Sequence, residues 1–327
     1  MLVLARADVE RLLTPADVIV AVEAAFVAQA RGRAIVPPRT GLAAGEDGVL
    51  LVMPAALGGA RGEAGLGAKL VSVYERNRER GYPTLHAVYV LLEAATGRPL
   101  AVLEATALTG IRTGATSALA ARFLARPTAR SVACFGAGAQ ARWQLECLAA
   151  VRRIERVEVI GRDRERVVAF AATMAERLGV RVTAADDPRR AVREADVVTC
   201  ATTSREPVVF GADLRPGVHV DLVGAFRPSD READTEAVRR ARVVVDTYAG
   251  ALEEAGDILI PLKEGAIARD HIAAELSEVV TGARPGRRRD DEITLFKSVG
   301  WALEDLAAAR LAYELARRQG VGCQVRL

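Results

Sequence analysis

The chain has 327 residues, of which 50% are hydrophobic and 27% are charged, and its formal net charge is +3. A chain of this length exceeds what one hydrophobic core usually fills, so we expect two domains. No segment reaches the ~18 uninterrupted apolar residues of a membrane span, and the arginines are spread along the chain, so neither membrane insertion nor nucleic-acid binding is expected. The N-terminus lacks a basic segment followed by an apolar core, which favours a cytoplasmic location over secretion.

The first third of the chain predicts a helix and then a mostly antiparallel sheet. Residues 15–31 carry apolar side chains at helical spacing, with Thr14 as the cap and Pro15 at the first helical position. Extended apolar stretches follow between 49 and 104, and the last two, LHAVYVLLE and PLAVLEA, read as buried on both faces. Because few helices are available to cover them, we expect a second copy of the chain to pack there and form a homodimer. The next predicted helix ends before Pro127.

From Pro127 onward, short apolar strands alternate with amphipathic helices. The strand patterns are SVACFG, RVEVIG, VRVTA, DVVTCAT, HVDLVGA and ARVVVD. Such alternation predicts a parallel sheet covered on both faces, the doubly wound Rossmann type of α/β fold. The last predicted helix ends at Gly320. We therefore predict an N-terminal α+β domain over 1–112, to which 299–327 return, and a Rossmann domain over 113–298.

A tight glycine turn, FGAGAQA, follows the first of these strands and precedes a helix. In dinucleotide-binding folds the first glycine makes the turn, the second lets the backbone approach the pyrophosphate, and the helix N-terminus faces the phosphate charge. Gly136 and Gly138 occupy these positions, and Ala141 is an accepted replacement for the third glycine. The pattern favours a nucleotide site, and a plain strand-to-helix turn is the alternative.

The tip of the second strand indicates which nicotinamide cofactor is bound. An acid there accepts a hydrogen bond from the ribose 2′-hydroxyl of NAD, whereas a cation suits the 2′-phosphate of NADP. This chain has Gly161, Arg162 and Asp163 at the tip. Arg162 favours NADP(H). NAD(H) is the alternative, because Asp163 is able to accept from a hydroxyl, and both residues are also candidates for the start of the next helix.

Three cations in the first domain are candidates either for binding an anion or for an ordinary surface position. Lys69 interrupts the apolar strand pattern GLGAKLVSVY, and Arg39 and Arg112 lie at the ends of predicted elements. A buried cation needs an anion, so each of them either meets an anion or reaches the surface. His86 lies within an apolar strand and is expected to be a core histidine rather than a base. No pattern resembles a nucleophile–base triad, and three scattered histidines predict no metal site.

A set of segments stands in collinear order between about residues 3 and 322: PPRT, GAKLVSVY, the stretch from YPTLHAVYV to ARFLAR, GAGAQA, GAFRPSDREAD and LFKSVGWALEDLAAARLAYE. Together these segments resemble the ornithine cyclodeaminase/mu-crystallin family. The resemblance implies a Rossmann domain that binds NAD(H) or NADP(H) and an N-terminal domain that binds substrate and forms a homodimer. It also implies chemistry at the carbon between an amino or imino nitrogen and a carboxylate.

The resemblance implies roles for individual residues as well. Arg39, Lys69 and Arg112 would bind the substrate carboxylate, and Lys69 would in addition handle a proton near the imine. Besides the glycine turn and the strand tip, the residues that would line the cofactor are Thr84, Arg112, Thr113, Ala139, Gln140, Thr202, Ser204, Val223, Gly224, Ser298 and Val299.

One departure from the family pattern bears on the reaction. Ornithine cyclodeaminases carry an acid in the loop after the LVG strand, where this chain has Phe226, and Asp230 is displaced from that position. This favours the mu-crystallin-like branch and predicts an NAD(P)H-dependent reductase of α-imino acids such as pyrroline- or piperideine-2-carboxylate. The alternatives are an alanine-type amino-acid dehydrogenase, ornithine cyclodeaminase itself, and a non-catalytic NADPH-binding protein of the crystallin type.

Overall fold

The computed structural model describes most of the chain, namely residues 1–45, 47–59 and 64–326. The chain divides into two units. The first comprises Met1–Arg112 and Trp301–Leu327, and the second comprises Thr113–Gly300. The predicted domain limits are residues 112 and 298, and the chain passes between the units at Arg112, within helix α3 (Ala105–Leu124), and at Gly300.

Within the described residues, the first unit is built on an eight-stranded sheet with the order β16-β1-β7-β6-β5-β4-β2, and β3 also pairs with β4. Neighbours from β4 to β7 are antiparallel, as predicted, whereas β1 runs parallel to β7. The strands are β1 (Leu2–Leu4), β2 (Ala34–Ile35), β3 (Thr40–Ala44), β4 (Gly48–Leu57), β5 (Gly65–Tyr74), β6 (Leu85–Leu92), β7 (Pro99–Glu104) and β16 (Cys323–Gln324). The helices are α1 (Arg6–Leu12), α2 (Pro15–Ala30), the 3-10 helix η1 (Glu75–Arg80) and α11 (Ala302–Gln319).

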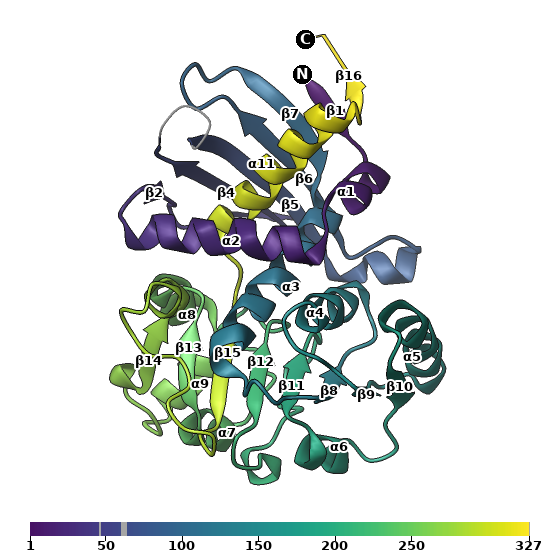
Figure 1. Cartoon of the computed structure of the whole chain (residues 1–327), viewed down its shortest axis with the longest axis vertical. Helices are drawn as coiled ribbons and strands as arrows, with labels where there is room; N and C mark the ends of the chain where they lie inside the picture. Colours follow the sequence, from purple (N-terminus) through teal and green to yellow (C-terminus); the bar gives the residue numbers. More distant parts are fainter. Residues whose placement is uncertain (46, 60–63, 327) are drawn as a thin grey trace. The chain divides into compact units, whose positions relative to one another are not determined.

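Helices cover one face of this sheet. Helix α11 packs against α2 and against strands β4, β5 and β6 (Figure 1). Side chains alternate along a strand, so Val71, Ala87 and Tyr89 point to the helical face and are buried. Leu70 and Val88 point to the opposite face, where they are partly exposed.

This alternation corrects two expectations from the sequence. The prediction that β6 and β7 are buried on both faces is wrong for the single chain, because every second side chain is at least partly exposed. The prediction of a core histidine at His86 is wrong for the same reason, since His86 shares the outward face with Val88 and is exposed. An apolar run conceals the alternation when Val and Leu occupy both faces.

The second unit is a parallel sheet with helices between successive strands, which confirms the predicted doubly wound α/β fold (Figure 1). The strand order is β10-β9-β8-β11-β12-β15-β13-β14, and all neighbours are parallel. The strands are β8 (Ser131–Phe135), β9 (Arg156–Ile160), β10 (Arg181–Ala184), β11 (Val197–Cys200), β12 (His219–Leu222), β13 (Arg242–Val245), β14 (Ile272–Glu275) and β15 (Thr294–Lys297). The helices are α4 (Ala139–Ala149), α5 (Arg164–Leu178), α6 (Pro188–Glu194), η2 (Gly211–Asp213), α7 (Thr235–Arg240), α8 (Tyr248–Glu254), α9 (Gly256–Lys263), η3 (Arg269–His271) and α10 (Leu276–Val280).

The central strands β8, β11, β12 and β15 are buried along their whole length, as expected for a sheet covered on both faces. The chain runs from β8 to β9 on one side and later returns to β11 on the other, so the strand order reverses between β8 and β11. In the part of the chain that the structure describes, no single helix is long and apolar enough to span a membrane. The pair α1 and α2 reaches that length and composition only together, and it is bent by 85°.

Candidate functional site

Loops after five neighbouring strands of the second unit lie along the carboxyl edge of its sheet. Strands β9, β8, β11, β12 and β15 are adjacent and parallel, and the reversal of strand order lies within this row. Ligands of open α/β sheets bind in the crevice at such a reversal. The predicted cofactor residues on this edge are Gly136, Gly138, Ala139 and Gln140 after β8, Gly161, Arg162 and Asp163 after β9, Thr202 and Ser204 after β11, Val223 and Gly224 after β12, and Ser298 and Val299 after β15.

The turn after β8 needs its first glycine for the fold itself. Gly136 has a φ of +114°, and a Cβ atom at this position would lie 2.6 Å from the carbonyl oxygen of Ala201. The Gly136 N–H donates to the carbonyl of Ile160 at 2.8 Å. Gly136 therefore permits the close approach of the turn to the loop after β11, which a side chain would prevent.

Gly138 differs, because the protein leaves room beside it. Its backbone is extended, with φ −122°, and the nearest atom to an added Cβ would be Nη2 of Arg166 at 3.4 Å. Gly138 is the N-cap of α4 and has no side chain that could cap the N–H groups of the first turn. A pyrophosphate would find these N–H groups and the positive helix end, with the end of the Arg166 side chain as the nearest group beside Gly138, so the residues present fit a dinucleotide.

The acid at the tip of β9 is already engaged in the fold. The Asp163 carboxylate caps α5 by accepting from the Arg166 N–H at 3.1 Å. The side chain of Arg162 is exposed. Arg166, which the sequence analysis missed, extends back to the glycine turn, and its Nε donates to the Ala137 carbonyl at 3.0 Å. Cations therefore predominate where the strand tip faces the turn.

A buried glutamate that the sequence analysis also missed links two loops of this edge. Glu232 accepts from the N–H and the hydroxyl of Thr202, each at 2.8 Å, and from the N–H of Gly224 at 2.7 Å. Burial raises the pKa of Glu232 above its ordinary value. Because one carboxylate holds the loops after β11 and β12, it positions the predicted cofactor residues of both. The segment GAFRPSDREAD contains this acid, but nothing in the pattern indicates its burial.

The loop after β15 is held from two sides. The Asp246 carboxylate accepts from the Ser298 hydroxyl at 2.9 Å and from the Val299 N–H at 2.8 Å. Lys297, the last residue of β15, forms a buried ion pair with Asp257 at 2.8 Å. Ser298 and Val299 are thus fixed before any ligand binds, as preorganised binding requires.

The first unit contains a second group of candidates, four buried charged residues that we call the Lys69 cluster: Lys69, Arg112, Glu304 and Asp305. Lys69 is 1% exposed on β5, Arg112 is 4% exposed on α3, and both acids are fully buried in the first turn of α11. Oδ2 of Asp305 lies 2.8 Å from Nζ of Lys69, and Oδ1 lies 2.8 Å from Nε of Arg112. Glu304 accepts from Nη1 of Arg112 at 2.6 Å. The structure thus joins two of the three predicted cations through acids that the sequence analysis missed.

Burial governs the electrostatics of the Lys69 cluster. It lowers the pKa of Lys69 from 10.5 to about 8, although the Asp305 carboxylate opposes this shift. Burial alone would lower the pKa of Arg112 as well, but Asp305 and Glu304 raise it above the ordinary value. A lysine with a pKa near 8 is able both to hold and to release a proton close to neutral pH.

Tyr89 adds a hydroxyl to the surroundings of Lys69. It lies opposite Lys69 in the register of β5 and β6, and burial raises its pKa well above 10.0. Its hydroxyl is buried and has no hydrogen-bond partner among the residues that the structure describes. An unpaired buried hydroxyl costs free energy, which is typical of sites where function competes with stability.

The segment WALEDLAAARLAYE held a signal for the missed acids. Glu304 and Asp305 lie among buried apolar residues such as Leu303 and Leu306. Acids on a buried helix face need cations, just as Lys69 in an apolar strand needs an anion. The two signals are complementary, but a sequence pattern does not show that they meet.

Two further predicted residues of the first unit lie at the ends of elements, whereas Thr113 belongs to the second unit and lies within α3. Arg39 directly precedes β3, and Thr84 directly precedes β6; both are partly exposed. Thr113 follows Arg112 on α3 and is 9% exposed. The roles of these residues in binding stay predictions.

The loop after β12 carries no acid in the place where cyclodeaminases have one. Phe226 stands there, and the Arg227 guanidinium lies 5.7 Å from the centroid of its ring. The displaced Asp230 accepts a hydrogen bond from the neighbouring Ser229 hydroxyl at 2.7 Å. Asp230 is therefore engaged locally, and its presence in the sequence does not restore the missing acid.

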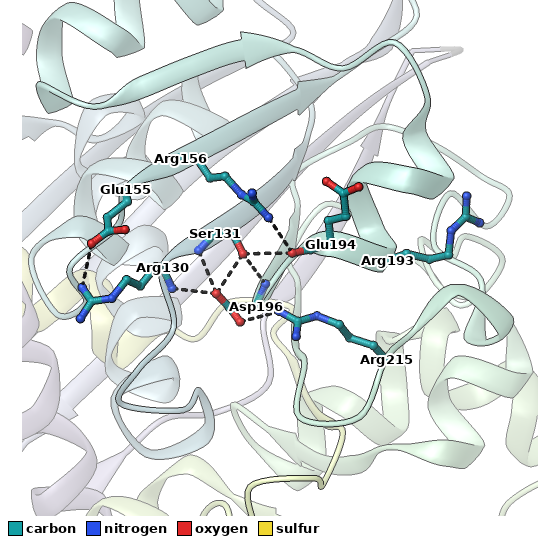
Figure 2. Close-up of a pocket in the computed structure, with 8 residues that line it drawn as sticks. All are labelled: Arg130, Ser131, Glu155, Arg156, Arg193, Glu194, Asp196 and Arg215. Atoms are coloured by element: carbon teal, nitrogen blue, oxygen red, sulfur yellow. Dashed lines mark hydrogen bonds and ion pairs between the residues drawn. The ribbon is translucent and has the colours of Figure 1, made fainter.

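A polar pocket lies at the opposite, amino edge of the second sheet (Figure 2). Figure 2 shows the residues that line it: Arg130, Ser131, Glu155, Arg156, Arg193, Glu194, Asp196 and Arg215. Asp196 accepts from the Ser131 hydroxyl at 2.9 Å and from Arg215 at 2.5 Å. Because its charged groups are engaged by neighbouring side chains and carbonyls and the glycine turn is at the other edge, we interpret this pocket as a structural network.

The parallel sheet, the glycine turn at its reversal and the loops fixed along its carboxyl edge define a dinucleotide-binding α/β protein. The chain belongs to the ornithine cyclodeaminase/mu-crystallin family, whose model matches residues 1–320. The family expected from the sequence is thereby confirmed.

Individual relatives match the chain along its whole length. It is 39% identical over 327 residues to the Delta(1)-pyrroline-2-carboxylate reductase of Bacillus cereus, and the match covers 99% of each chain. It is similar to the structure of Thermococcus litoralis Delta(1)-pyrroline-2-carboxylate reductase in complex with NADH and L-proline, at 43% identity and a TM-score of 0.96, over 99% of this chain and 100% of that one. It is also similar to an archaeal alanine dehydrogenase dimer with bound NAD, at 35% identity and a TM-score of 0.93, over 100% of this chain and 99% of that one.

Proposed function

We propose that the protein is an NAD(P)H-dependent reductase of cyclic α-imino acids, with pyrroline-2-carboxylate and piperideine-2-carboxylate as its substrates. The observation that carries the proposal is the Lys69 cluster, in which two acids fix a buried arginine and a lysine of lowered pKa. Perturbed titratable groups of this kind are typical of catalytic centres. The fit of the sheet edge to a dinucleotide and the two relatives named as pyrroline-2-carboxylate reductases support the same activity.

Reduction of an imine requires a hydride at carbon and a proton at nitrogen. Bound NAD(P)H supplies the hydride. Arg112 and Arg39 bind the substrate carboxylate, which places the imine carbon for transfer. Lys69 donates a proton from Nζ to the imine nitrogen as the hydride arrives. The neutral Lys69 side chain then regains a proton from solvent. The product is the cyclic α-amino acid, and no ammonia is released.

Individual residues of the chain also bear on the alternative functions, namely a cyclodeaminase, an amino-acid dehydrogenase and a non-catalytic nucleotide-binding protein. Phe226 in place of an acid argues against a cyclodeaminase, because Asp230 is displaced from that position along the chain. An amino-acid dehydrogenase would use the same Lys69 cluster on an imine formed from a 2-oxo acid and ammonia. A non-catalytic nucleotide-binding protein would have no need of a lysine held at a perturbed pKa.

The test is the oxidation of NADPH and NADH with pyrroline-2-carboxylate, piperideine-2-carboxylate, and pyruvate plus ammonia. We expect the highest kcat/KM with a cyclic imino acid. Lys69→Ala should lower kcat by about 10²-fold or more, the range for a positioned general acid. Lys69→Arg should restore substrate binding better than turnover, because a guanidinium keeps the charge but does not release a proton.

Arg112→Ala is the control for carboxylate binding and should act mainly through KM. A folded Lys69→Ala protein that shows only a raised KM would reduce Lys69 to an electrostatic clamp. Ammonia release from ornithine, or nucleotide binding without turnover of any imino acid, would contradict the reductase proposal.

We further infer that NADP(H) is preferred over NAD(H). Asp163, the residue that would accept from a ribose hydroxyl, is engaged in capping α5. Arg162 is exposed at the same tip, and Arg166 lies beside the glycine turn. Two cations suit a 2′-phosphate. The solved relatives described above contain NADH and NAD, so NAD(H) is the competing outcome.

We also propose that the protein is a cytoplasmic homodimer. The outward face of the first sheet carries the exposed apolar side chains of Leu42, Leu70 and Val88, and the related archaeal alanine dehydrogenase is described as a dimer. Cys134, Cys147 and Cys200 are buried and form no disulfide among the described residues, which suits a reducing compartment that also supplies NAD(P)H.

A further inference from the structure

Asp305 occupies a position that the proposed reaction does not yet use. Its carboxylate is fully buried and contacts the Lys69 ammonium through one oxygen and the Arg112 guanidinium through the other, each at 2.8 Å. Glu304, the preceding residue, is equally buried and accepts from Arg112. Two acids of the same helix turn are thus available for comparison, and Asp305 is the one that bridges both cations.

Regular structure fixes both sides of the Lys69–Asp305 contact. Asp305 lies in the first turn of α11, where the helix macrodipole stabilises negative charge. Lys69 lies in the middle of β5, paired with Met53 on β4 and with Tyr89 on β6. The distance between Nζ and Oδ2 is therefore set by a strand and a helix rather than by loops, as a precise catalytic geometry requires.

We propose that Asp305 is a positioning residue, which fixes the Lys69 ammonium and the Arg112 guanidinium relative to each other and keeps Lys69 charged for proton donation. This role rests on the proposed reductase function.

The charges that face Lys69 explain why Asp305 matters. They come from Asp305 and Glu304 on α11 and from Arg112 on α3, with the Tyr89 hydroxyl on β6 as the further titratable group. Burial and the repulsion from Arg112 favour the neutral amine, whereas Asp305 provides the largest influence in favour of the ammonium and Glu304 the smallest. Without the Asp305 charge, two buried cations would face each other and Lys69 would lose its proton. A neutral lysine has no proton to give to the imine nitrogen.

The composition permits a direct measurement of this effect. Lys69, Lys263 and Lys297 are the three lysines of the chain. Protein labelled with 13C in its lysine side chains should therefore give a simple Cε spectrum, in which Lys69→Arg identifies the Lys69 signal by its loss. A pH titration of the cofactor-free protein then reports the Lys69 pKa without any assay of activity. Lys263, exposed at the end of α9, is the internal reference.

We expect Lys69 of the wild type to titrate near pH 8. Asp305→Asn should lower this midpoint by about 1 to 3 pH units, the usual effect of an adjacent opposite charge, and the alkaline limb of kcat should move with it. Glu304→Gln removes the same charge from the neighbouring residue and should shift the midpoint less than half as far. Asp305→Glu keeps the charge but displaces it, so kcat should fall while the midpoint stays within about half a unit.

An Asp305→Asn protein with an unchanged Lys69 midpoint overturns the proposal, and so does a Glu304→Gln protein with an equal shift. If Asp305→Asn does not fold, the wild type and the Glu304→Gln and Asp305→Glu variants still test the proposal. A wild-type midpoint well below neutral pH would show that Asp305 does not keep Lys69 charged, and an Asp305→Glu protein with unchanged kcat excludes the positioning role. Failure of the proposed reductase function would look different from failure of the Asp305 proposal. In that case the wild type would not turn over imino acids, although its Lys69 would still titrate near pH 8.

Discussion

At the tip of β9, side chains of opposite charge lie where the ribose of a dinucleotide is recognised. Asp163 is engaged as the cap of α5, whereas Arg162 is exposed. Arg162→Ala should therefore weaken NADPH binding by about 1.5 to 3 kcal/mol, the scale of a hydrogen bond to a charged group. NADH binding should change little, because NADH has no 2′-phosphate. Calorimetric titration of both cofactors into the folded proteins measures the difference.

Arg181 provides the control for this prediction. It is also exposed, but it begins β10 and therefore lies at the amino edge of the sheet, away from the glycine turn. Arg181→Ala should leave the affinity for both cofactors unchanged. A wild-type preference for NADH, or an equal loss for both cofactors in Arg162→Ala, would instead identify Asp163 as the residue that recognises the ribose.

The pKa of Asp196 determines part of the pH dependence of the second unit's stability. Burial alone would raise its pKa, but hydrogen bonds from the Arg130 and Ser131 N–H groups, the Ser131 hydroxyl and the charge of Arg215 lower it from 3.8 to about 2. A depressed carboxyl pKa stabilises the fold above pH 4, and this contribution is lost as the pH falls through about 2. At 1.4 kcal/mol per unit, reduced by solvent screening, Asp196→Asn should cost about 1 to 2 kcal/mol at pH 7.

Urea unfolding of the wild type and Asp196→Asn at pH 7 and pH 2 measures this effect. The difference in free energy of unfolding should be present at pH 7 and largely absent at pH 2. Asp186→Asn is the control, since the Asp186 pair with Arg164 is exposed and is expected to contribute less than about 1 kcal/mol. A difference between wild type and Asp196→Asn that is the same at both pH values would contradict the assignment.

Residues of the candidate site could be predicted where their own surroundings in the sequence were unusual. Lys69 was recognisable because a charge interrupts an apolar strand. Asp305 and Glu232 were not, since each acts on groups that are distant along the chain. Local periodicity shows that a charge is buried, but the long-range pairing that satisfies it follows only from the packed elements.

At the scale of elements, the turn between β8 and α4 separates a structural glycine from one that a ligand requires. Gly136→Ala places a Cβ against the Ala201 carbonyl at 2.6 Å and forces a side chain to adopt a φ of +114°, so the melting temperature should fall. Gly138→Ala meets only Nη2 of Arg166 at 3.4 Å. This second variant should keep its melting temperature but bind NADPH at least about tenfold more weakly, a loss of about 1.4 kcal/mol.

The comparison needs thermal unfolding without cofactor and a binding titration for each variant. Gly138→Ala with wild-type NADPH affinity would mean that no phosphate approaches this position. Gly136→Ala with wild-type stability would mean that the loop after β11 adapts to the added side chain.

The alternating strand and helix patterns after Pro127 predicted the second sheet, because each strand–helix unit repeats the same signal. Strands β1, β2, β3, β14 and β16 were not predicted, and β3 and β14 illustrate why. The residues of β3, TGLAA, are largely exposed and show no apolar period, and β14, IAAE, is too short and too small in its side chains to differ from a loop. Both segments become strands because they pair with a neighbouring strand. Such pairing cannot be predicted from the local sequence pattern.

At the scale of the whole molecule, the outward face of the first sheet is the surface with the clearest need of a partner. Leu42 is 61% exposed, Val88 42% and Leu70 36%. Antiparallel pairing places the further apolar side chains of Leu50, Val52, Val90 and Val102 on the same face, beside the polar residues Ser72, His86 and Glu104. A face with several exposed apolar side chains of this kind is typical of a subunit interface.

Val88→Glu introduces a charge on this face and should convert the proposed dimer to a monomer, because an unpaired charge is costly to bury in an interface. Sedimentation equilibrium at micromolar concentration measures the change. Val168→Glu, the same substitution at a half-exposed position of α5 in the second unit, is the control and should remain dimeric. Since Lys69 points to the helical face of β5, its signal should titrate unchanged in the monomer, so that a loss of turnover reports assembly alone. A fully active wild-type monomer, or a dimeric Val88→Glu protein, would exclude this face as the interface.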